Sequence, residues 1–136
     1  MPSVLEEKDA IRELLARYCF HFDNGEFEEW LDCFTEDATF DVVTLGRFSG
    51  RDALRMFLQL VPLTNGLPMM KHCVMNSIVR VDGGRASAQS YVLVVAHAGE
   101  ILGLNVAGRY DDQLTKRGGT WRFTERRAHL DLMSGR

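Results

Sequence analysis

The second half of the chain, from Met70 onward, has the pattern of one long antiparallel β-meander. β-Branched and aromatic residues dominate four stretches, at about residues 70–81, 86–96, 101–114 and 120–132. Tight-turn sequences separate these stretches: Asp82-Gly83-Gly84, a turn around Gly99, and Arg117-Gly118-Gly119. Strands of this length twist and coil strongly. The pattern therefore predicts a curled sheet whose concave face must be covered by other elements.

The first third of the chain has helical periodicity. Ser3 and Glu6 have the spacing of a capping box. An apolar stripe follows at helical spacings: Val4, Ile11, Leu14, Leu15, Tyr18 and Phe22. The stretch Asp23-Asn24-Gly25 is predicted to end this first helix. A second, shorter helix is expected to bury Phe27, Trp30, Leu31 and Phe34.

Between this region and the meander, the sequence predicts short elements. The run FTEDA is predicted to be a turn, ATFDVV a short strand, and the piece around Phe48 an extended segment. Ser49 and Asp52 are expected to open a third helix. Its apolar residues are Leu54, Phe57, Leu58 and Val61.

The composition is that of a single globular domain spanning residues 1–136, with 46% apolar and 26% charged residues. The net charge of −3 comes without a basic stripe, which argues against a nucleic-acid partner. No run approaches the roughly 20 apolar residues of a membrane span, and MPSVLEEKDA lacks the pattern of a secretion signal. Cys19, Cys33 and Cys73 are scattered, as expected for reduced thiols in a cytoplasmic protein.

Helices followed by a curled antiparallel sheet predict an α+β domain. Three N-terminal helices are expected to pack on the concave face of a cone-shaped sheet. This arrangement encloses a pocket that is mostly apolar with a few polar groups, as small-molecule sites are. Met75, Val79, Val92 and Val94 are assigned to the opposite face. We therefore expect a homo-oligomer, a dimer or a trimer, that buries this face.

Four runs of the sequence resemble SnoaL-like members of the nuclear transport factor 2-like superfamily. They are ARYCFHFDNGEFEEWLDCFTEDATFD, FSGRDAL, KHCVMNSIVRVDGGRASAQSYVLV and GRYDDQLTKRGGTWRFTERRAHLD. The resemblance extends from about Ile11 to Leu132 and implies the cone-shaped fold. It implies less about function, because this fold includes dehydratases, isomerases, polyketide cyclases, dioxygenase small subunits and binding modules.

The site pattern resembles that of scytalone dehydratase, bile acid 7α-dehydratase and hexachlorocyclohexane dehydrochlorinase. In these enzymes an aspartate after the first helix and a histidine on the first long strand form a hydrogen-bonded dyad inside the cone. Asp23 and His72 are at the matching places. Tyr18 matches the tyrosine of the bile acid enzyme, and Arg126, or its neighbour Arg127, matches an arginine of those pockets. Where the scytalone enzyme has a second histidine, this sequence has Tyr91.

These residue types suit elimination by general base catalysis. Histidine accepts a proton near neutral pH with little tuning, and an ionised aspartate on its other ring nitrogen fixes the tautomer. We therefore assign His72 as the base and Asp23 as the residue that orients it. Tyr18, Tyr91 and Arg126 are assigned to an enolate-like oxygen or to the leaving group. Substrate-binding candidates are Tyr91, Asn76 (which strand alternation places on the same face as His72), Phe57, Met70 and Phe22.

Structural roles stay open for most of these residues. Asp23 could cap the second helix, and His72 could be a core or rim histidine. Tyr18 could serve packing alone, and Asn76 could satisfy a buried backbone group. One arginine of the Arg126-Arg127 pair could form a structural salt bridge to a helix carboxylate.

The sequence thus predicts a lyase of the dehydratase type, or an isomerase, that needs no cofactor and acts on a small apolar hydroxyl or carbonyl compound. The alternatives are a non-catalytic small-molecule binding module, a structural subunit, and a polyketide-cyclase-like enzyme whose aspartate does the acid–base work. A metal site from His21, Asp23, His72 and His129 is not expected, because no HxxE, HxH or CxxC spacing supports it.

Overall fold

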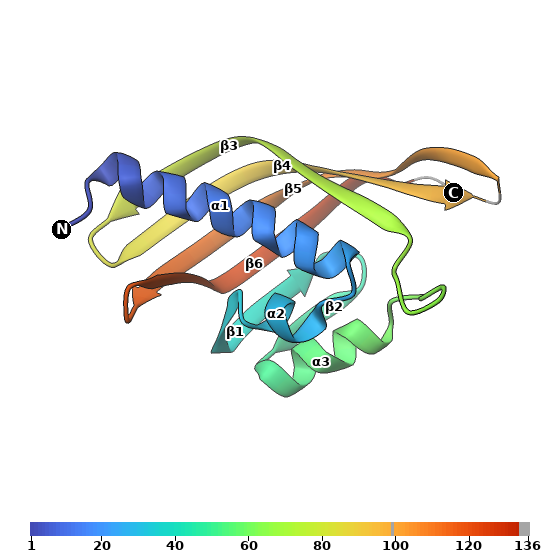
Figure 1. Ribbon diagram of the computed structural model, residues 1–136, viewed down its shortest axis with the longest axis horizontal. Coiled ribbons are helices and arrows are strands. Elements are labelled where there is room, and N and C mark those ends of the chain that lie inside the picture. Colours follow the sequence, from blue (N-terminus) through green and yellow to red (C-terminus); the bar gives the residue numbers. More distant parts are fainter. Residues whose placement is uncertain (99, 134–136) are drawn as a thin grey trace.

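One curled six-stranded sheet forms the body of the molecule in the computed structural model, which describes residues 1–98 and 100–133 (Figure 1). The strands are β1 (Phe34–Val42), β2 (Gly46–Ser49), β3 (Met70–Asp82), β4 (Arg85–Ala98), β5 (Ile101–Arg117) and β6 (Thr120–Met133). Their order in the sheet is β2-β1-β6-β5-β4-β3. The predicted meander β3–β6 is confirmed, whereas β1 joins the sheet parallel to β6. The predicted turn at Gly99 lies outside the described residues.

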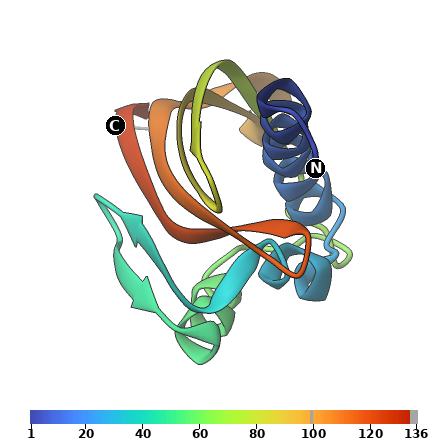
Figure 2. The same cartoon turned by 90° about the vertical axis from the view of Figure 1, so that its left-hand side faces the viewer.

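Three helices lie against this sheet: α1 (Val4–Asp23), α2 (Phe27–Leu31) and α3 (Arg51–Gln59). The capping box of Ser3 and Glu6 is present, and the predicted stripe of α1 is buried from Ile11 to Phe22. The helix α1 runs along the inner side of β3, as the end view shows (Figure 2). The α+β architecture with helices on the concave face is therefore confirmed. No helix of the described chain is long and apolar enough to cross a bilayer.

Two local predictions were wrong. The run FTEDA is not a turn, because β1 already begins at Phe34, which pairs with Phe123 of β6. The helix α3 has no side-chain cap and follows Gly50. Ser49 instead places its hydroxyl oxygen 3.1 Å from that of Thr39, across the β1–β2 pair.

A β-bulge in β3 decides which residues face the interior. Asn76 has a φ of 58°, and the register with β4 shifts between Met75 and Ile78. Asparagine tolerates this left-handed conformation better than most residues. His72 and Val79 both face inward, although regular alternation over seven positions would place them on opposite faces.

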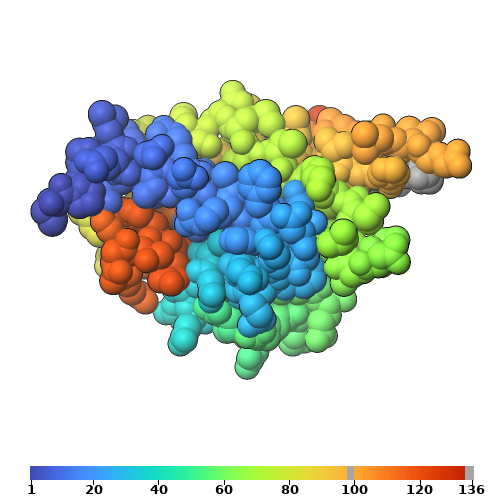
Figure 3. All heavy atoms as spheres, in the orientation of Figure 1, coloured from blue at the N-terminus to red at the C-terminus, as the bar shows by residue number. Residues whose placement is uncertain are grey.

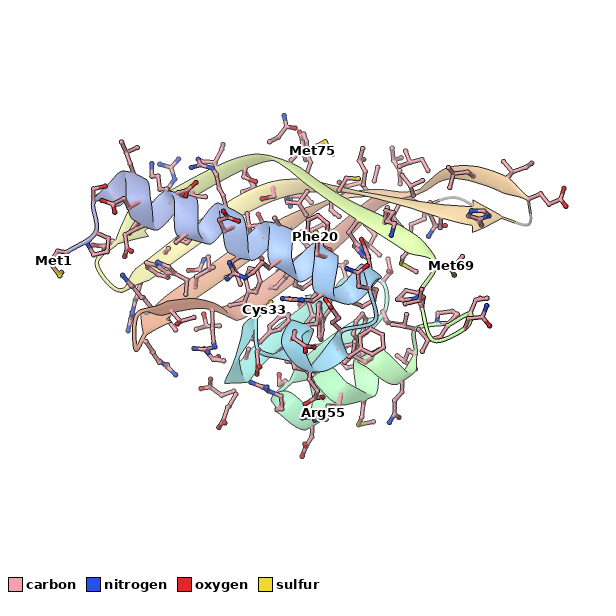
Figure 4. The ribbon with its side chains drawn as sticks, viewed as in Figure 1. Met1, Phe20, Cys33, Arg55, Met69 and Met75 are labelled. Atoms are coloured by element: carbon pink, nitrogen blue, oxygen red, sulfur yellow. The ribbon has the colours of Figure 1, made fainter. Side chains whose placement is uncertain are left out.

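The predicted outer face of the sheet was wrong at three positions: the bulge turns Val79 inward, and Val92 and Val94 of β4 face inward opposite Val74 and His72. Val79, Val92 and Val94 are buried in the core, with exposed fractions of 3%, 1% and 6%. Met75 does lie on the outer side of β3, where it pairs with Tyr91 of β4 (Figure 4). The ends of β4 and β5 extend beyond the helices (Figure 3), and Ile101, Leu102 and Leu104 are exposed there.

The pairing of β5 with β6 is irregular at Gly108. The register shifts between Ala107 and Arg109, and the backbone of His129 crosses directly over Gly108. A Cβ atom at this position would lie 2.2 Å from the carbonyl oxygen of His129, far inside van der Waals contact. Only glycine fits here without moving a strand. Ala128 and Leu130, on either side of His129, line the inner surface of the sheet.

Replacing Gly108 with alanine is expected to lower the free energy of unfolding by about 3 kcal/mol or more, because the clash is with backbone and a strand must move. Urea unfolding followed by circular dichroism measures this change. Gly103→Ala is the matched control on the same strand, since a Cβ there meets nothing within 4 Å. Equal stability of the two variants would contradict the role assigned to this contact.

Candidate functional site

A buried carboxylate and an imidazole meet where α1 ends and β3 begins. Asp23 is the last residue of α1, and His72 is the third residue of β3. The Oδ1 atom of Asp23 lies 2.7 Å from Nδ1 of His72, and the backbone N–H of His72 donates to Oδ2 at 2.8 Å. The side chains are 8% and 12% exposed. The ring of Phe22 packs edge-on against the imidazole at 5.0 Å.

This geometry decides between the two roles left open for Asp23. Both of its carboxylate oxygens accept hydrogen bonds from His72, and α2 starts after Glu26 without a side-chain cap. Asp23 therefore does not cap the second helix. A carboxylate can only accept, so Nδ1 carries the hydrogen and Nε2 keeps its lone pair.

A cavity of about 370 Å³ lies between the helices and the inner face of the sheet. His72, Tyr18 and the predicted residues Phe22, Phe57 and Met70 all line it. The rest of the wall is mainly apolar: Phe40, Val42, Leu45, Leu60, Val61, Pro62, Val92, Val94, Val106, Ala128, Leu130 and Met133. The polar side chains of the lining are Tyr18, His72, Asn105 and Tyr110. A dry wall with a few polar groups is the usual construction of a site for a small organic molecule.

Two predicted substrate-binding residues lie outside this cavity. Tyr91 is 56% exposed on the outer face, directly opposite Met75. Asn76 is exposed at the bulge and does not share the face of His72. The assignment of Asn76 was wrong because the extra residue in β3 shifts the alternation on which it depended. Tyr91 was assigned from the resemblance, and its position on β4 faces outward.

Arg126 is the inward-facing member of the arginine pair, but it does not line the cavity. Its side chain is fully buried, and its Nε and Nη2 atoms donate to the carboxylate of Asp112 at 2.8 and 3.1 Å. Arg127 points outward, with its side chain 51% exposed near Asp41. The structural salt bridge that was left open for one arginine is thus present at Arg126, with a strand residue as its partner. Because Arg126 is not part of the cavity lining, the predicted direct contact between Arg126 and a ligand is not possible from this position.

The phenol rings of Tyr18 and Tyr110 separate Arg126 from the cavity. Their centroids lie 6.0 Å apart, and Cζ of Arg126 is 3.6 Å from the centroid of Tyr110 and 4.3 Å from that of Tyr18. Burial raises the pKa of Tyr18 from 10.0 to about 12, and the charge of Arg126 opposes this rise. Burial also raises the pKa of Tyr110 well above its ordinary value. Both phenols are therefore protonated at neutral pH and can donate hydrogen bonds.

The raised pKa of Tyr18 predicts that stability falls in strong alkali. Below pH 10 the tyrosine is protonated in both states; between pH 10 and 12 the unfolded chain loses this proton while the folded chain keeps it. The free energy of unfolding is expected to drop by about 2–3 kcal/mol across this window on account of Tyr18. Urea titrations at several pH values measure the drop, which Tyr18→Phe should reduce. Tyr91→Phe, on the outer face, is the matched control and should leave the drop unchanged.

Sequence reasoning missed Tyr110, Asp112 and Asn105. The signal for the first two was present, because β5 alternates inward and outward, and Val106, Tyr110 and Leu114 are all buried on the inner side. Asn105 is the extra residue where the β4–β5 register shifts between Val94 and Val95, so alternation alone does not place it.

The histidines considered for a metal site are spread over the molecule. Nδ1 of His21 contacts Glu26 at 3.0 Å, and Nε2 of His129 contacts Asp111 at 3.1 Å on the outer side. Within residues 1–98 and 100–133, no three side chains of His, Cys, Asp or Glu gather as a metal site would require.

A curled sheet that holds a buried Asp–His pair beside an apolar cavity defines a small α+β domain of the nuclear transport factor 2-like kind. The chain belongs to the SnoaL-like domain family, whose model matches residues 3–127. This confirms the resemblance found in the sequence. No curated protein matches the chain.

Solved structures show the same fold. A variant of Rv3472 from Mycobacterium tuberculosis, a protein of unknown function, is 30% identical with a TM-score of 0.81, over 94% of this chain and 73% of that chain. An NTF2-like protein with a cystatin-like fold from Novosphingobium aromaticivorans is 23% identical with a TM-score of 0.83, over 98% and 86% of the two chains. A protein of the same bacterium, provisionally named a scytalone dehydratase, is 24% identical with a TM-score of 0.82, over 97% and 89%.

Proposed function

We propose that this protein is a lyase of the dehydratase type that needs no cofactor and uses His72 as a general base. The observation that carries the proposal is the 2.7 Å contact between Asp23 and His72 at the wall of a mainly apolar cavity. The carboxylate leaves the lone pair of Nε2 available to a ligand. The provisional name of one structural relative, a scytalone dehydratase, agrees with this chemistry.

The proposed reaction is the loss of water from a β-hydroxy carbonyl compound. Nε2 of His72 takes the proton from the carbon next to the carbonyl, and the C–H electron pair moves to form an enolate. The enolate then re-forms the carbonyl while its C=C bond shifts and the C–O bond to the hydroxyl breaks. The proton held by His72 passes to the departing hydroxide, so water leaves and the imidazole is neutral again. Tyr18 donates a hydrogen bond to the enolate oxygen.

The cavity limits the substrate to a small and mostly apolar molecule. Its volume of about 370 Å³ equals that of roughly a dozen waters. The rings of Phe22, Phe40 and Phe57 form much of the wall, and flat aromatic ligands pack well against such rings. We therefore propose hydroxylated ketones built on about one or two fused rings as the substrate class.

The test is proton exchange and water loss in a panel of such hydroxy ketones. The compounds are incubated with the protein in deuterated water, and NMR follows exchange at the carbon next to the carbonyl while absorbance follows the conjugated product. At least one compound is expected to exchange and to lose water, and His72→Gln should abolish both. His129→Gln, a histidine paired with Asp111 on the outer side, is the matched control. Compounds that bind tightly without either reaction would show a binding module instead.

We further propose that the chain forms a homo-oligomer through the outer face of the sheet. Ile78 and Tyr91 are 54% and 56% exposed there, and Met75 pairs with Tyr91. Arg109 and Asp111 of the neighbouring strand β5 carry both signs of charge, which suits a face that contacts its own copy. Sedimentation velocity should show a dimer or a trimer, and Tyr91→Glu should convert it to a monomer. A wild-type chain that sediments as a monomer at micromolar concentration would contradict this.

A further inference from the structure

We propose that the buried Arg126–Asp112 pair acts through Tyr110 and Tyr18 to make the cavity selective for ligands that carry an oxyanion. This inference deepens the proposed function, on which its catalytic meaning rests. It assigns Tyr18 and Tyr110 as donors to the ligand oxygen, and Arg126 and Asp112 as positioning residues that never touch the ligand.

The first argument is the placement of the cation. Cζ of Arg126 lies 3.6 Å from the ring centroid of Tyr110, 4.3 Å from that of Tyr18 and 4.4 Å from that of Phe123. Of these three rings, those of Tyr18 and Tyr110 line the cavity. A fully buried guanidinium over a ring face interacts strongly with the ring and with any negative charge on the oxygen of that ring. The cation is therefore placed to assist these two phenols.

The second argument is that a buried ion pair is a poor source of stability. Arg126 and Asp112 both have fully buried side chains, and the Nη1 atom of Arg126 has no hydrogen-bond partner among the described residues. Apolar residues of similar volume at such positions are often as stabilising as a buried pair or more so. The fold alone therefore does not require the charges. An unpaired N–H next to two phenols points to an electrostatic role.

The third argument concerns the protonation of the two phenols. Burial raises the pKa of both Tyr18 and Tyr110 above the ordinary value. Both hydroxyls therefore keep their hydrogens at neutral pH. Since both residues line the cavity, either hydroxyl can donate to an oxygen of the ligand.

The experiment compares two probes that differ in charge, 4-nitrophenol at a pH where it is ionised and nitrobenzene. The variant Asp112→Leu with Arg126→Met removes both charges and keeps apolar volume in the core. Its affinity for 4-nitrophenolate is expected to fall about tenfold or more, while its affinity for nitrobenzene stays within about twofold. Tyr110→Phe should give a similar selective loss. Combining Tyr110→Phe with the Asp112→Leu, Arg126→Met variant should add little to the loss of affinity for 4-nitrophenolate, because both changes interrupt the same interaction between Arg126, Tyr110 and the ligand.

The matched control is Arg109→Met with Asp111→Leu, an ion pair of the same residue types on β5 that faces outward. It should leave the binding of both probes unchanged. An equal loss for both probes in the charge-pair variant would show a purely structural role and overturn the inference, as would a wild-type protein that does not bind 4-nitrophenolate. His72→Gln should abolish the lyase reaction and retain the selectivity between the probes. A failure of the proposed reaction is therefore distinguishable from a failure of this inference.

Discussion

Replacing Asp23 with asparagine is expected to reduce kcat/KM for any compound that proves active in the exchange assay by about 10²–10⁴-fold. The asparagine amide is close in shape to the carboxylate, so the protein should fold. Its carbonyl oxygen can still accept the backbone N–H of His72, which now donates to Asp23 at 2.8 Å. Its NH₂ group then faces Nδ1 and donates to it. The imidazole must carry its hydrogen on Nε2, where the base needs a lone pair.

The tautomer gives a readout that does not depend on knowing the substrate. Nitrogen-15 NMR of labelled histidine should show Nδ1 protonated in the wild type and Nε2 protonated in Asp23→Asn. The double variant Asp23→Asn with His72→Gln should be no less active than His72→Gln alone, because both residues serve one step. An Asp23→Asn protein with nearly full activity and a retained His72 tautomer would contradict the assigned roles. If Asp23→Asn lost activity while His72→Gln kept it, the aspartate itself would be the acid–base group.

Replacing Arg126 alone with methionine is expected to lower the free energy of unfolding by about 3–5 kcal/mol. The change leaves the carboxylate of Asp112 buried without its partner, and burial already raises the pKa of Asp112 even with the arginine in place. The carboxylate must then take up a proton on folding or draw water into the core. Chemical denaturation near neutral pH measures the loss.

Removing Asp112 as well should restore most of this stability. The Asp112→Leu, Arg126→Met protein is expected to be within about 1–2 kcal/mol of the wild type, since no unpaired charge is left in the core. An Arg126→Met variant as stable as the wild type would contradict the burial of this pair. A double variant as unstable as Arg126→Met would show that the core cannot accommodate the apolar replacements.

Most of the fold could be predicted from local sequence patterns, namely hydrophobic periodicity and turn residues. The stripe of α1 buries its residues by simple periodicity, the four long strands follow their β-branched and aromatic stretches, and turn chemistry at Asp82-Gly83-Gly84 marks a strand boundary. The run FTEDA was misassigned because its polar residues favour a turn, whereas the pairing of Phe34 with Phe123 is a long-range contact. Such contacts override local propensity and cannot be read from neighbouring residues.

The contact at the centre of the site was predictable from the resemblance, whereas several side chains were assigned to the wrong face of a strand. Asp23 and His72 lie 49 positions apart, and only the resemblance connected them before the structure placed them in contact. Asn76 was misplaced because a bulge shifts the alternation in β3, and Tyr91, assigned from the resemblance, lies on the outer face of β4. Arg126 was expected to reach a ligand, yet the inward face of β6 at this point meets Asp112 and two phenol rings.

The two hydrogen bonds between Asp23 and His72 couple the packing of α1 against β3 to the proposed reaction. One carboxylate oxygen anchors the main chain of β3 to the last turn of α1, and the other sets the state of the imidazole. Loosening of that last turn would leave most of the core intact while the ring lost its orientation. On warming, the proposed reaction should therefore stop at a temperature below the main melting transition, because the last turn of α1 unfolds locally first.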